Sequence, residues 1–102
     1  MVAMIRRVML ISIESPTDAH LERMRSCLAD TANQVDGVVA SVVHDALPLN
    51  NSQCNFVWET VFTDTAAFEG YRDHPYHTDV LIGLFTSVQF TATTAFVNYA
   101  GA

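Results

Sequence analysis

Three side chains that can hold or move a proton lie within seven positions of one another in the second half of the chain. Tyr71, His74 and His77 occur in the run Tyr-Arg-Asp-His-Pro-Tyr-His, which straddles Pro75. Histidine is the side chain whose unperturbed pKa lies closest to physiological pH. A phenol can donate a hydrogen bond to an oxygen that becomes negatively charged during a reaction. This segment is therefore the leading candidate for general acid–base chemistry.

A metal site is the first alternative for the two histidines. The spacing of His74 and His77 would suit one face of a helix, but Pro75 interrupts the regular turn and the sequence fixes no third ligand. The two cysteines, Cys27 and Cys54, have neither metal-ligand spacing nor a nucleophile motif around them, and we expect two reduced thiols. We predict no metal and no cofactor.

The composition predicts a single domain with more apolar surface than its own core can bury. Half of the 102 residues are hydrophobic and 16% are charged, whereas about 25% are charged in typical soluble domains. We expect one domain over residues 1–102, paired with a second copy in a two-fold homodimer. The net charge is −6 and no basic cluster exceeds Arg6-Arg7, which argues against a nucleic-acid partner.

The apolar run near the N-terminus is too short for a membrane span or a secretory signal. It extends from Val8 to Ile11, Ser12 interrupts it, and Glu14 follows. A strand explains this run better, and we expect a cytoplasmic protein with no membrane partner.

The apolar pattern predicts the order strand, helix, strand, strand, helix, strand. The four expected strands cover residues 5–13, 38–43, 56–62 and 89–99. This order is typical of the ferredoxin-like βαββαβ fold, an α+β subunit whose antiparallel sheet carries both helices on one face. The other sheet face then needs cover, which the sheet of a second subunit would supply.

Two helical regions should connect these strands. Ser15 is placed to cap the first region and Pro16 to open it. Its core stripe consists of Leu21, Met24, Leu28, Ala32 and Val35. Asp64 is placed to cap the second region, which should bend at His74 because of the following proline. A further helical piece would run through Val80, Leu81 and Leu84.

Side chains alternate between the two faces of each expected strand, and this alternation indicates which of them could reach a common site. Arg7 shares one face of the first strand with Met9, whereas Val8 lies on the opposite face. Trp58 shares one face of the third strand with Phe56. Parity alone leaves open whether these aromatic residues line the core or a cavity.

Two blocks of the sequence match the pattern of a known family. They are the opening strand Ile5-Arg-Arg-Val-Met-Leu-Ile and the block Phe62-x-Asp64-x-x-Ala67-x-x-x-Tyr71-x-x-His74-Pro75-x-His77. With these blocks the chain resembles the stress-responsive A/B barrel (Dabb) family, whose members are dimeric α+β barrels. The cofactor-independent antibiotic-biosynthesis monooxygenases have a similar architecture, but the His-Pro step favours the first family.

The resemblance implies a reaction and a set of roles. Some plant relatives look like polyketide cyclases, which close a linear poly-β-keto chain by an aldol-type step. In those relatives the second histidine of the block is the base and the tyrosine assists, which makes His77 and Tyr71 the matching catalytic residues here. Many relatives carry a histidine in the first strand where this chain has Arg7, a side chain suited to bind a carboxylate or an enolate. Trp58 and His74 complete the expected substrate-binding set.

Two functional hypotheses follow. The first is a cofactor-independent cyclase or lyase that acts on a small, apolar or aromatic, polyketide-like carbonyl compound. The alternative is a non-catalytic small-molecule-binding or stress-response dimer that kept the barrel and lost its chemistry.

Overall fold

Four strands form one antiparallel sheet in the protein, described here from a computed structural model of residues 3–47, 49, 54–86 and 95–101. The strands are β1 (Met4–Ile11), β2 (Val38–Asp45), β3 (Phe56–Phe62) and β4 (Ala95–Gly101). Their order across the sheet is β2-β3-β1-β4, and each neighbouring pair runs antiparallel. This order confirms the predicted ferredoxin-like βαββαβ arrangement.

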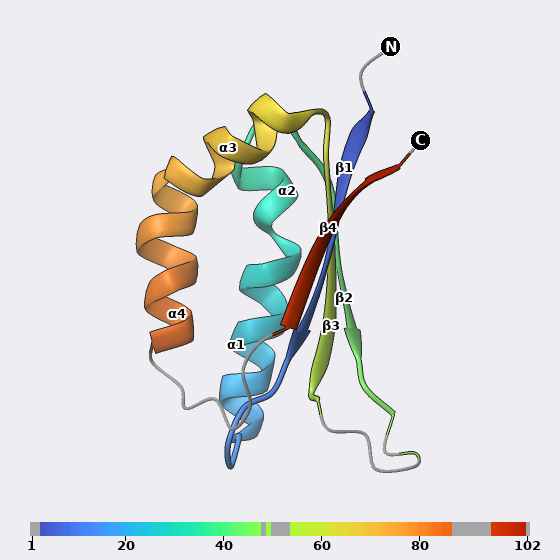
Figure 1. The fold of residues 1–102 in the computed structure, drawn as a ribbon. Helices are drawn as coiled ribbons and strands as arrows, with labels where there is room; N and C mark the ends of the chain where they lie inside the picture. Colours follow the sequence, from blue (N-terminus) through green and yellow to red (C-terminus); the bar gives the residue numbers. More distant parts are fainter. Residues whose placement is uncertain (1–2, 48, 50–53, 87–94, 102) are drawn as a thin grey trace.

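All the described helices lie on one side of the sheet, and they leave its other face bare (Figure 1). The helical elements are α1 (Asp18–Ala29), α2 (Thr31–Gln34), α3 (Thr65–Asp73), the π-helical segment η1 (Tyr76–Leu81) and α4 (Ile82–Thr86). Within the described ranges, no helix is both long enough and apolar enough to cross a membrane.

The hydrophobic core lies between the sheet and the helices. Its buried members are Ile11, Ile13, Met24, Leu28, Val35, Val38, Phe56, Trp58, Phe62, Tyr71, Leu81 and Leu84. The predicted stripe of the first helical region is confirmed, with Met24, Leu28 and Val35 buried and Leu21 and Ala32 packed against them. Because side chains alternate along β3, its aromatic residues all reach this face and supply much of the buried apolar area.

A short polar network crosses the core where α1 ends. The indole N–H of Trp58 donates to Ser41 Oγ at 2.8 Å, and Ser41 Oγ donates to the Leu28 carbonyl at 2.6 Å. The hydroxyl of Thr31 donates to the same carbonyl at 2.9 Å. Carbonyls in the last turn of a helix are commonly satisfied by side chains, and this one accepts from both hydroxyls. The network ties α1 to β2 and β3.

The start of α1 differs from the prediction. Thr17, and not Ser15, is the cap: its side chain accepts a hydrogen bond from the His20 amide at 3.1 Å. Ser15 instead adopts a left-handed turn conformation with φ of 47°. An N-cap side chain accepts from the amide two or three positions ahead. Because α1 begins at Asp18, Ser15 stands too far outside the first turn to serve this purpose.

The strand boundaries agree with the prediction within a few residues. β3 covers the predicted 56–62, whereas β1 ends at Ile11, and β2 continues to Asp45. The last strand extends to Gly101, and residues 89–94 of its predicted span lie outside the described part of the chain.

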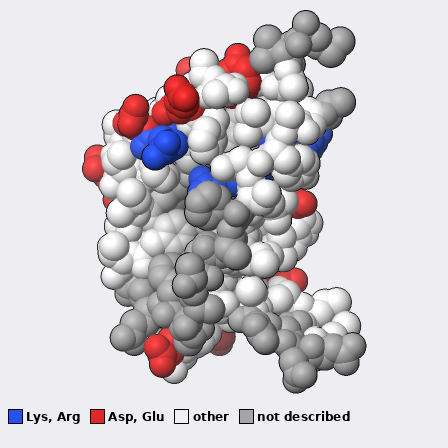
Figure 2. Space-filling view, in the orientation of Figure 1, with Lys and Arg blue, Asp and Glu red and all other residues white. Residues whose placement is uncertain are grey.

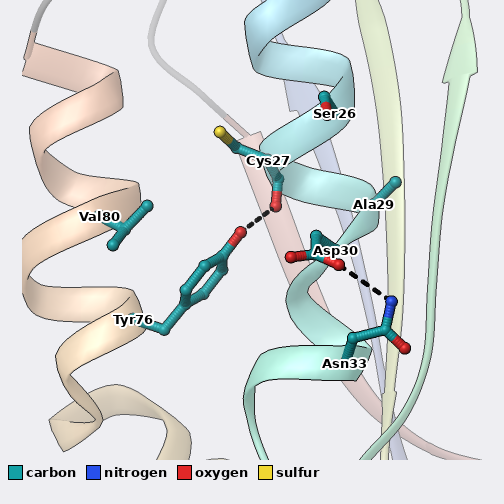
Figure 3. A pocket seen from close by; sticks show the side chains of 7 residues that line it. All are labelled: Ser26, Cys27, Ala29, Asp30, Asn33, Tyr76 and Val80. Atoms are coloured by element: carbon teal, nitrogen blue, oxygen red, sulfur yellow. Dashed lines mark hydrogen bonds between the residues drawn. The ribbon is translucent and has the colours of Figure 1, made fainter.

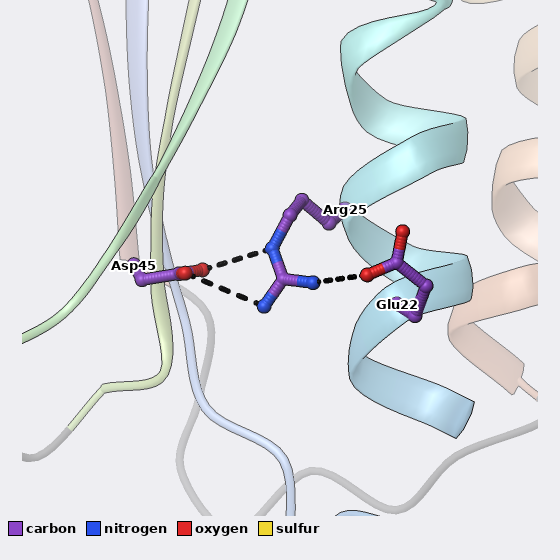
Figure 4. Close-up of polar contacts among 3 residues, drawn as sticks. All are labelled: Glu22, Arg25 and Asp45. Atoms are coloured by element: carbon purple, nitrogen blue, oxygen red, sulfur yellow. Dashed lines mark hydrogen bonds and ion pairs between the residues drawn. The ribbon is translucent and has the colours of Figure 1, made fainter. Parts of the chain in front are cut away.

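An ion-pair cluster on the surface joins α1 to the end of β2 (Figure 4). Arg25 Nε lies 3.1 Å from Asp45 Oδ1, and Arg25 Nη1 lies 2.6 Å from Glu22 Oε2. The guanidinium also lies over the Phe56 ring, 5.6 Å from its centroid. Exposed pairs of this kind contribute about 0–1 kcal/mol. The cluster therefore supports the packing of α1 without deciding it.

Gly37 allows the first turn of α3 to approach the start of β2. Its φ is +88°, and a Cβ at this position would lie 2.7 Å from Ala67 Cβ. Its carbonyl accepts a hydrogen bond from the Thr63 amide at 3.0 Å. Asp64 caps α3, as predicted, by accepting from the Ala67 amide at 2.8 Å. The site-bearing helix is thus fixed at its N-terminus by a cap and by a glycine contact.

We predict that Gly37→Ala lowers the free energy of unfolding by about 2–3 kcal/mol, because it adds both a left-handed backbone penalty and a steric clash. Urea denaturation measures this change. The matched control is Gly70→Ala within α3, where an added Cβ would meet no atom within 4 Å. That variant should gain roughly 0.5–1 kcal/mol from helix propensity. Equal stability of the two variants would contradict the close approach.

Candidate functional site

The candidate site begins where Pro75 ends α3. A proline has no amide hydrogen and disfavours helix at the residue before it. His74 is accordingly extended, with φ of −70° and ψ of 139°, which confirms the predicted bend. The chain then restarts as η1 and α4, which confirms the helical piece predicted through Val80, Leu81 and Leu84. The π-helical geometry of η1 was not predicted. π-helical turns are rare in proteins overall, but those that occur are often found at functional sites.

This break determines which nitrogen of His77 carries a hydrogen. The Arg72 carbonyl lies in the last turn of α3, and His77 Nδ1 lies 2.9 Å from it. A carbonyl oxygen can only accept a hydrogen bond, so Nδ1 must be the donor. In the neutral ring Nε2 then keeps its lone pair. The end of α3 therefore presents His77 in the tautomer that a general base at Nε2 requires.

Tyr71 lies beside this imidazole. The two ring centroids are 4.7 Å apart, and the Tyr71 ring also packs 5.2 Å from Phe62. The tyrosine is only 2% exposed. Burial raises the pKa of its hydroxyl to about 12, although the nearby positive charge of Arg7 acts in the opposite direction. The phenol is consequently a neutral hydrogen-bond donor throughout the physiological pH range.

Arg7 reaches the same region from β1. Its guanidinium lies over the Phe68 ring, 5.9 Å from the centroid, which places it on the covered face of the sheet. Burial lowers the pKa of Arg7, Tyr71 raises it, and the neighbouring charge of Arg72 lowers it again. Arginine nevertheless stays protonated in proteins. The structure thus brings Arg7, Tyr71 and His77 together from β1, α3 and η1.

The other two predicted binding residues have structural partners. Trp58 is 2% exposed, and its one hydrogen-bond donor is used by Ser41. Any contact it makes with a ligand would therefore involve the ring alone. His74 Nδ1 accepts from the Tyr76 amide at 3.0 Å, and the His74 carbonyl accepts from His77 N at 2.9 Å. His74 accordingly holds the turn that delivers His77.

Sequence reasoning missed the residue that fixes η1 in place. The Tyr76 hydroxyl donates to the Cys27 carbonyl of α1 at 2.6 Å (Figure 3). Burial raises the pKa of Tyr76 to about 12, with smaller contributions from Cys27 and Asp30. Because Tyr76 and His77 are adjacent, this anchor also limits where His77 can lie. The sequence signal that could have predicted this anchor is the tyrosine at the x position of the His-Pro-x-His block.

The Tyr76 anchor borders a shallow groove between α1 and η1. The groove has a volume of about 470 Å³. Its lining residues are Ser26, Cys27, Ala29, Asp30, Asn33, Tyr76 and Val80. Asp30 accepts hydrogen bonds from the side chains of Asn33 and Gln34, which hold the pKa of its carboxyl below the usual range. None of the predicted catalytic residues lines this groove.

The chain carries 11 acidic and 5 basic side chains. On the face that Figure 2 shows, acidic atoms appear at several places and basic atoms at only a few. Within the described part of the chain, no three His, Cys, Asp or Glu side chains gather in a way that could hold a metal ion.

The comparisons with known proteins place the chain by fold. No family model matches it, and no curated protein matches it by sequence. Solved structures do match. A dimeric ferredoxin-like protein of unknown function from Thermobifida fusca is 18% identical with a TM-score of 0.82, over 98% of this chain and 92% of that one. Identity at this level shows the fold alone.

Two further structures extend the comparison. A Dabb-family protein with a ferredoxin-like fold from Mesorhizobium loti is 17% identical, with a TM-score of 0.80 over 98% of both chains. A hydroxynitrile lyase from Passiflora edulis is 11% identical, with a TM-score of 0.83 over 98% of this chain and 94% of that one. The structural neighbours of this chain thus include a Dabb-family protein, a hydroxynitrile lyase and proteins of unknown function.

We predict that Tyr71 makes the fold sensitive to alkali. A phenol in the unfolded chain loses its proton near pH 10, whereas Tyr71 in the folded protein does so at about 12. The folded state binds more protons between these values, so stability falls as the pH rises through that window. The loss should reach roughly 2–3 kcal/mol for this group. The chain contains no lysine that would titrate in the same range.

The measurement is urea denaturation of wild type and Tyr71→Phe at several pH values from 8 to 12. The stability of the variant should decline less steeply above pH 10, because Phe cannot ionise. Tyr76, whose pKa is also raised to about 12, leaves part of the decline in both proteins. Parallel curves for the two proteins would contradict the assignment.

Proposed function

We propose that the chain is a cofactor-independent enzyme of the stress-responsive A/B barrel type. Its reaction is an aldol-type cyclisation or a lyase reaction on a small, apolar, polyketide-like carbonyl compound. His77 is the general base, Tyr71 the hydrogen-bond donor to the oxyanion, and Arg7 the anchor for a negatively charged group. Trp58 and His74 contact the substrate at the edge of this set.

The observation that carries the proposal is the pairing of a tautomer-fixed imidazole with a neutral phenol. His77 Nδ1 is held by the Arg72 carbonyl at 2.9 Å, and the Tyr71 ring lies 4.7 Å from the His77 ring. A base and an oxyanion donor on adjacent side chains are what proton abstraction next to a carbonyl requires. The positive charge of Arg7 favours the enolate that forms.

In the proposed reaction, His77 Nε2 removes a proton from a carbon between two carbonyl groups. The electron pair of the broken C–H bond moves onto a carbonyl oxygen, and the Tyr71 hydroxyl stabilises that enolate. The enolate carbon then attacks a second carbonyl of the same molecule, and a new C–C bond closes the ring. The resulting alkoxide takes back the proton from His77, so no external reactant is consumed.

The structural neighbours support this class of reaction without specifying it. One of them is a hydroxynitrile lyase, so a lyase reaction is among those to assay. A Dabb-family protein of the same fold supports placing this chain in that family. His74 and Trp58 also have hydrogen-bond partners within the described structure, which supports a positioning role for both beside the proposed substrate contact.

We further propose that the protein is a cytoplasmic homodimer that covers the bare sheet face with a second copy. The strand register places Val42, Val97 and Tyr99 on that face, with 44%, 55% and 47% of their surfaces exposed. Leu10 and Met4 are also exposed there. Contiguous apolar surface of this kind marks an interaction site. Two neighbours of the same fold are dimeric proteins.

We predict that His77→Ala removes turnover of a poly-β-keto substrate by about 10²–10⁴-fold, the usual contribution of a positioned base. Tyr71→Phe should also reduce turnover, because it removes the hydroxyl that donates to the oxyanion and keeps the ring.

A thermal-shift panel of aromatic and poly-β-keto compounds first identifies a ligand for these assays. A ligand at 100 times its Kd adds roughly 2.7 kcal/mol of stability, which shifts the melting point by about 4–8 °C for each kcal/mol.

The control is His20→Ala, which removes an exposed histidine of α1 far from the site in sequence. It should keep full activity. If the Tyr71→Phe, His77→Ala double variant binds the ligand like wild type but no protein turns it over, the non-catalytic binding function is correct. If His77→Ala unfolds the protein, the residue is structural and the catalytic assignment is wrong.

The homodimer is tested independently by light scattering at micromolar concentration. We expect twice the mass of the 11.3 kDa chain. A well-behaved monomer would contradict the dimer and leave the assignment of His77 untouched.

A further inference from the structure

Thr60 is a buried hydroxyl residue of β3 that lies beside the candidate site. It is 2% exposed. Because side chains alternate along β3, it lies on the covered face of the sheet between Trp58 and Phe62, which are also buried. Within the described ranges, its hydroxyl makes no hydrogen bond to a side chain or to the main chain. Buried polar groups almost always have a hydrogen-bond partner, so this hydroxyl calls for an explanation.

The neighbouring buried hydroxyls have partners. Ser41, directly opposite Thr60 on β2, donates to the Leu28 carbonyl at 2.6 Å and accepts from the Trp58 indole at 2.8 Å. Thr31 donates to the same carbonyl at 2.9 Å. These two hydroxyls hold helices against the sheet, whereas the Thr60 hydroxyl joins no two described elements. A valine has the same shape and would fill this position without burying a polar group.

The strand register places Thr60 next to two residues of the candidate site. It pairs with Arg7 of β1, and residues directly opposite one another have Cβ atoms about 4.5–5.5 Å apart. On the same face of β3, the next side chain is Phe62, which packs against the Tyr71 ring at 5.2 Å between centroids. Thr60 is therefore flanked by Arg7 and separated from Tyr71 by one side chain.

We propose that Thr60 binds the substrate, and that its hydroxyl donates a hydrogen bond to the carbonyl that is attacked during ring closure. The inference rests on the proposed function. There His77 and Tyr71 act on the carbon and the oxygen of the enolate, and the attacked carbonyl still needs a donor. As the new C–C bond forms, the electron pair of that C=O bond moves onto its oxygen. The Thr60 hydroxyl keeps its proton and stabilises this alkoxide until the alkoxide takes the proton from His77.

This role specifies the class of substrate. Side chains on one face of a strand are about 6–7 Å apart, so Tyr71 and Thr60 provide two separated donors. A poly-β-keto chain has carbonyls on alternate carbons, and the enolate and the attacked carbonyl of one chain are several carbons apart. A substrate with a single carbonyl would leave the Thr60 hydroxyl without a partner. The inference therefore favours the cyclisation over the lyase reaction.

The first test needs no ligand. Thr60→Val replaces a hydroxyl that has no partner by a methyl group, so its midpoint of urea denaturation should equal or exceed that of wild type. The matched control is Thr31→Val, which removes a buried hydroxyl that has a partner and should unfold at a lower urea concentration. A similar loss of stability in both variants would show that the Thr60 hydroxyl is structural, and would overturn the inference.

The second test measures turnover of the ethyl ester of a linear tetraketide acid, which has carbonyls on alternate carbons. Thr60→Val should lower kcat by about 10²–10³-fold, the usual effect of losing one oxyanion donor. Its KM should change much less, because the hydrogen bond is strongest in the transition state. Thr60→Ser keeps the hydroxyl and should retain most of the activity, and Thr31→Val should be as active as wild type.

The outcomes distinguish this inference from the proposed function. If Thr60→Val converts the ester like wild type and His77→Ala does not, the inference is wrong and the proposed function stands. If His77→Ala converts the ester like wild type, the proposed base is wrong, and a low kcat of Thr60→Val would still support the role of Thr60. If the wild type neither converts the ester nor is stabilised by it in a thermal-shift assay, both proposals are wrong.

Discussion

The alternation of side chains along β1 is the constraint on which the rest of the structure depends. Arg6 and Arg7 are adjacent in the sequence, and the pleat of the strand sends them to opposite faces of the sheet. Arg7 enters the covered face, where it meets Phe68 and the candidate site. Arg6 remains on the bare face beside Glu59. A register shift of β1 by one residue would exchange these positions and would also move Met9 and Ile11 from the core to the bare face.

The positions of Tyr76 and His77 depend on the interruption of the helix between α3 and η1. Pro75 ends α3, and the end of the helix frees the Arg72 carbonyl for His77. The same interruption lets Tyr76 reach the Cys27 carbonyl of α1. An uninterrupted helix would have used the Arg72 carbonyl internally and would have pointed the side chains of Tyr76 and His77 elsewhere. The break thus determines both the tautomer and the position of the imidazole.

Local signals predicted much of this fold because the hydrophobic pattern and the helix-capping residues indicate the same elements. The alternation in β3 follows from the period of its side chains, and the cap of α3 follows from the carboxylate of Asp64. The cap of α1 was predicted wrongly. Two neighbouring hydroxyl residues, Ser15 and Thr17, both suit an N-cap, and only the packed position of the helix decides which one is used.

The sequence by itself determined the order of the elements, which residues of a strand share a face, and the bend at Pro75. These features depend on the period of the side chains and on the missing proline donor. Only the tertiary structure decided that Arg7 meets Phe68 and Tyr71, that Trp58 uses its N–H on Ser41, and that Tyr76 holds η1 against α1. Those contacts join residues far apart in the chain. Their partners are set by the packing of helices on the sheet, which no local pattern encodes.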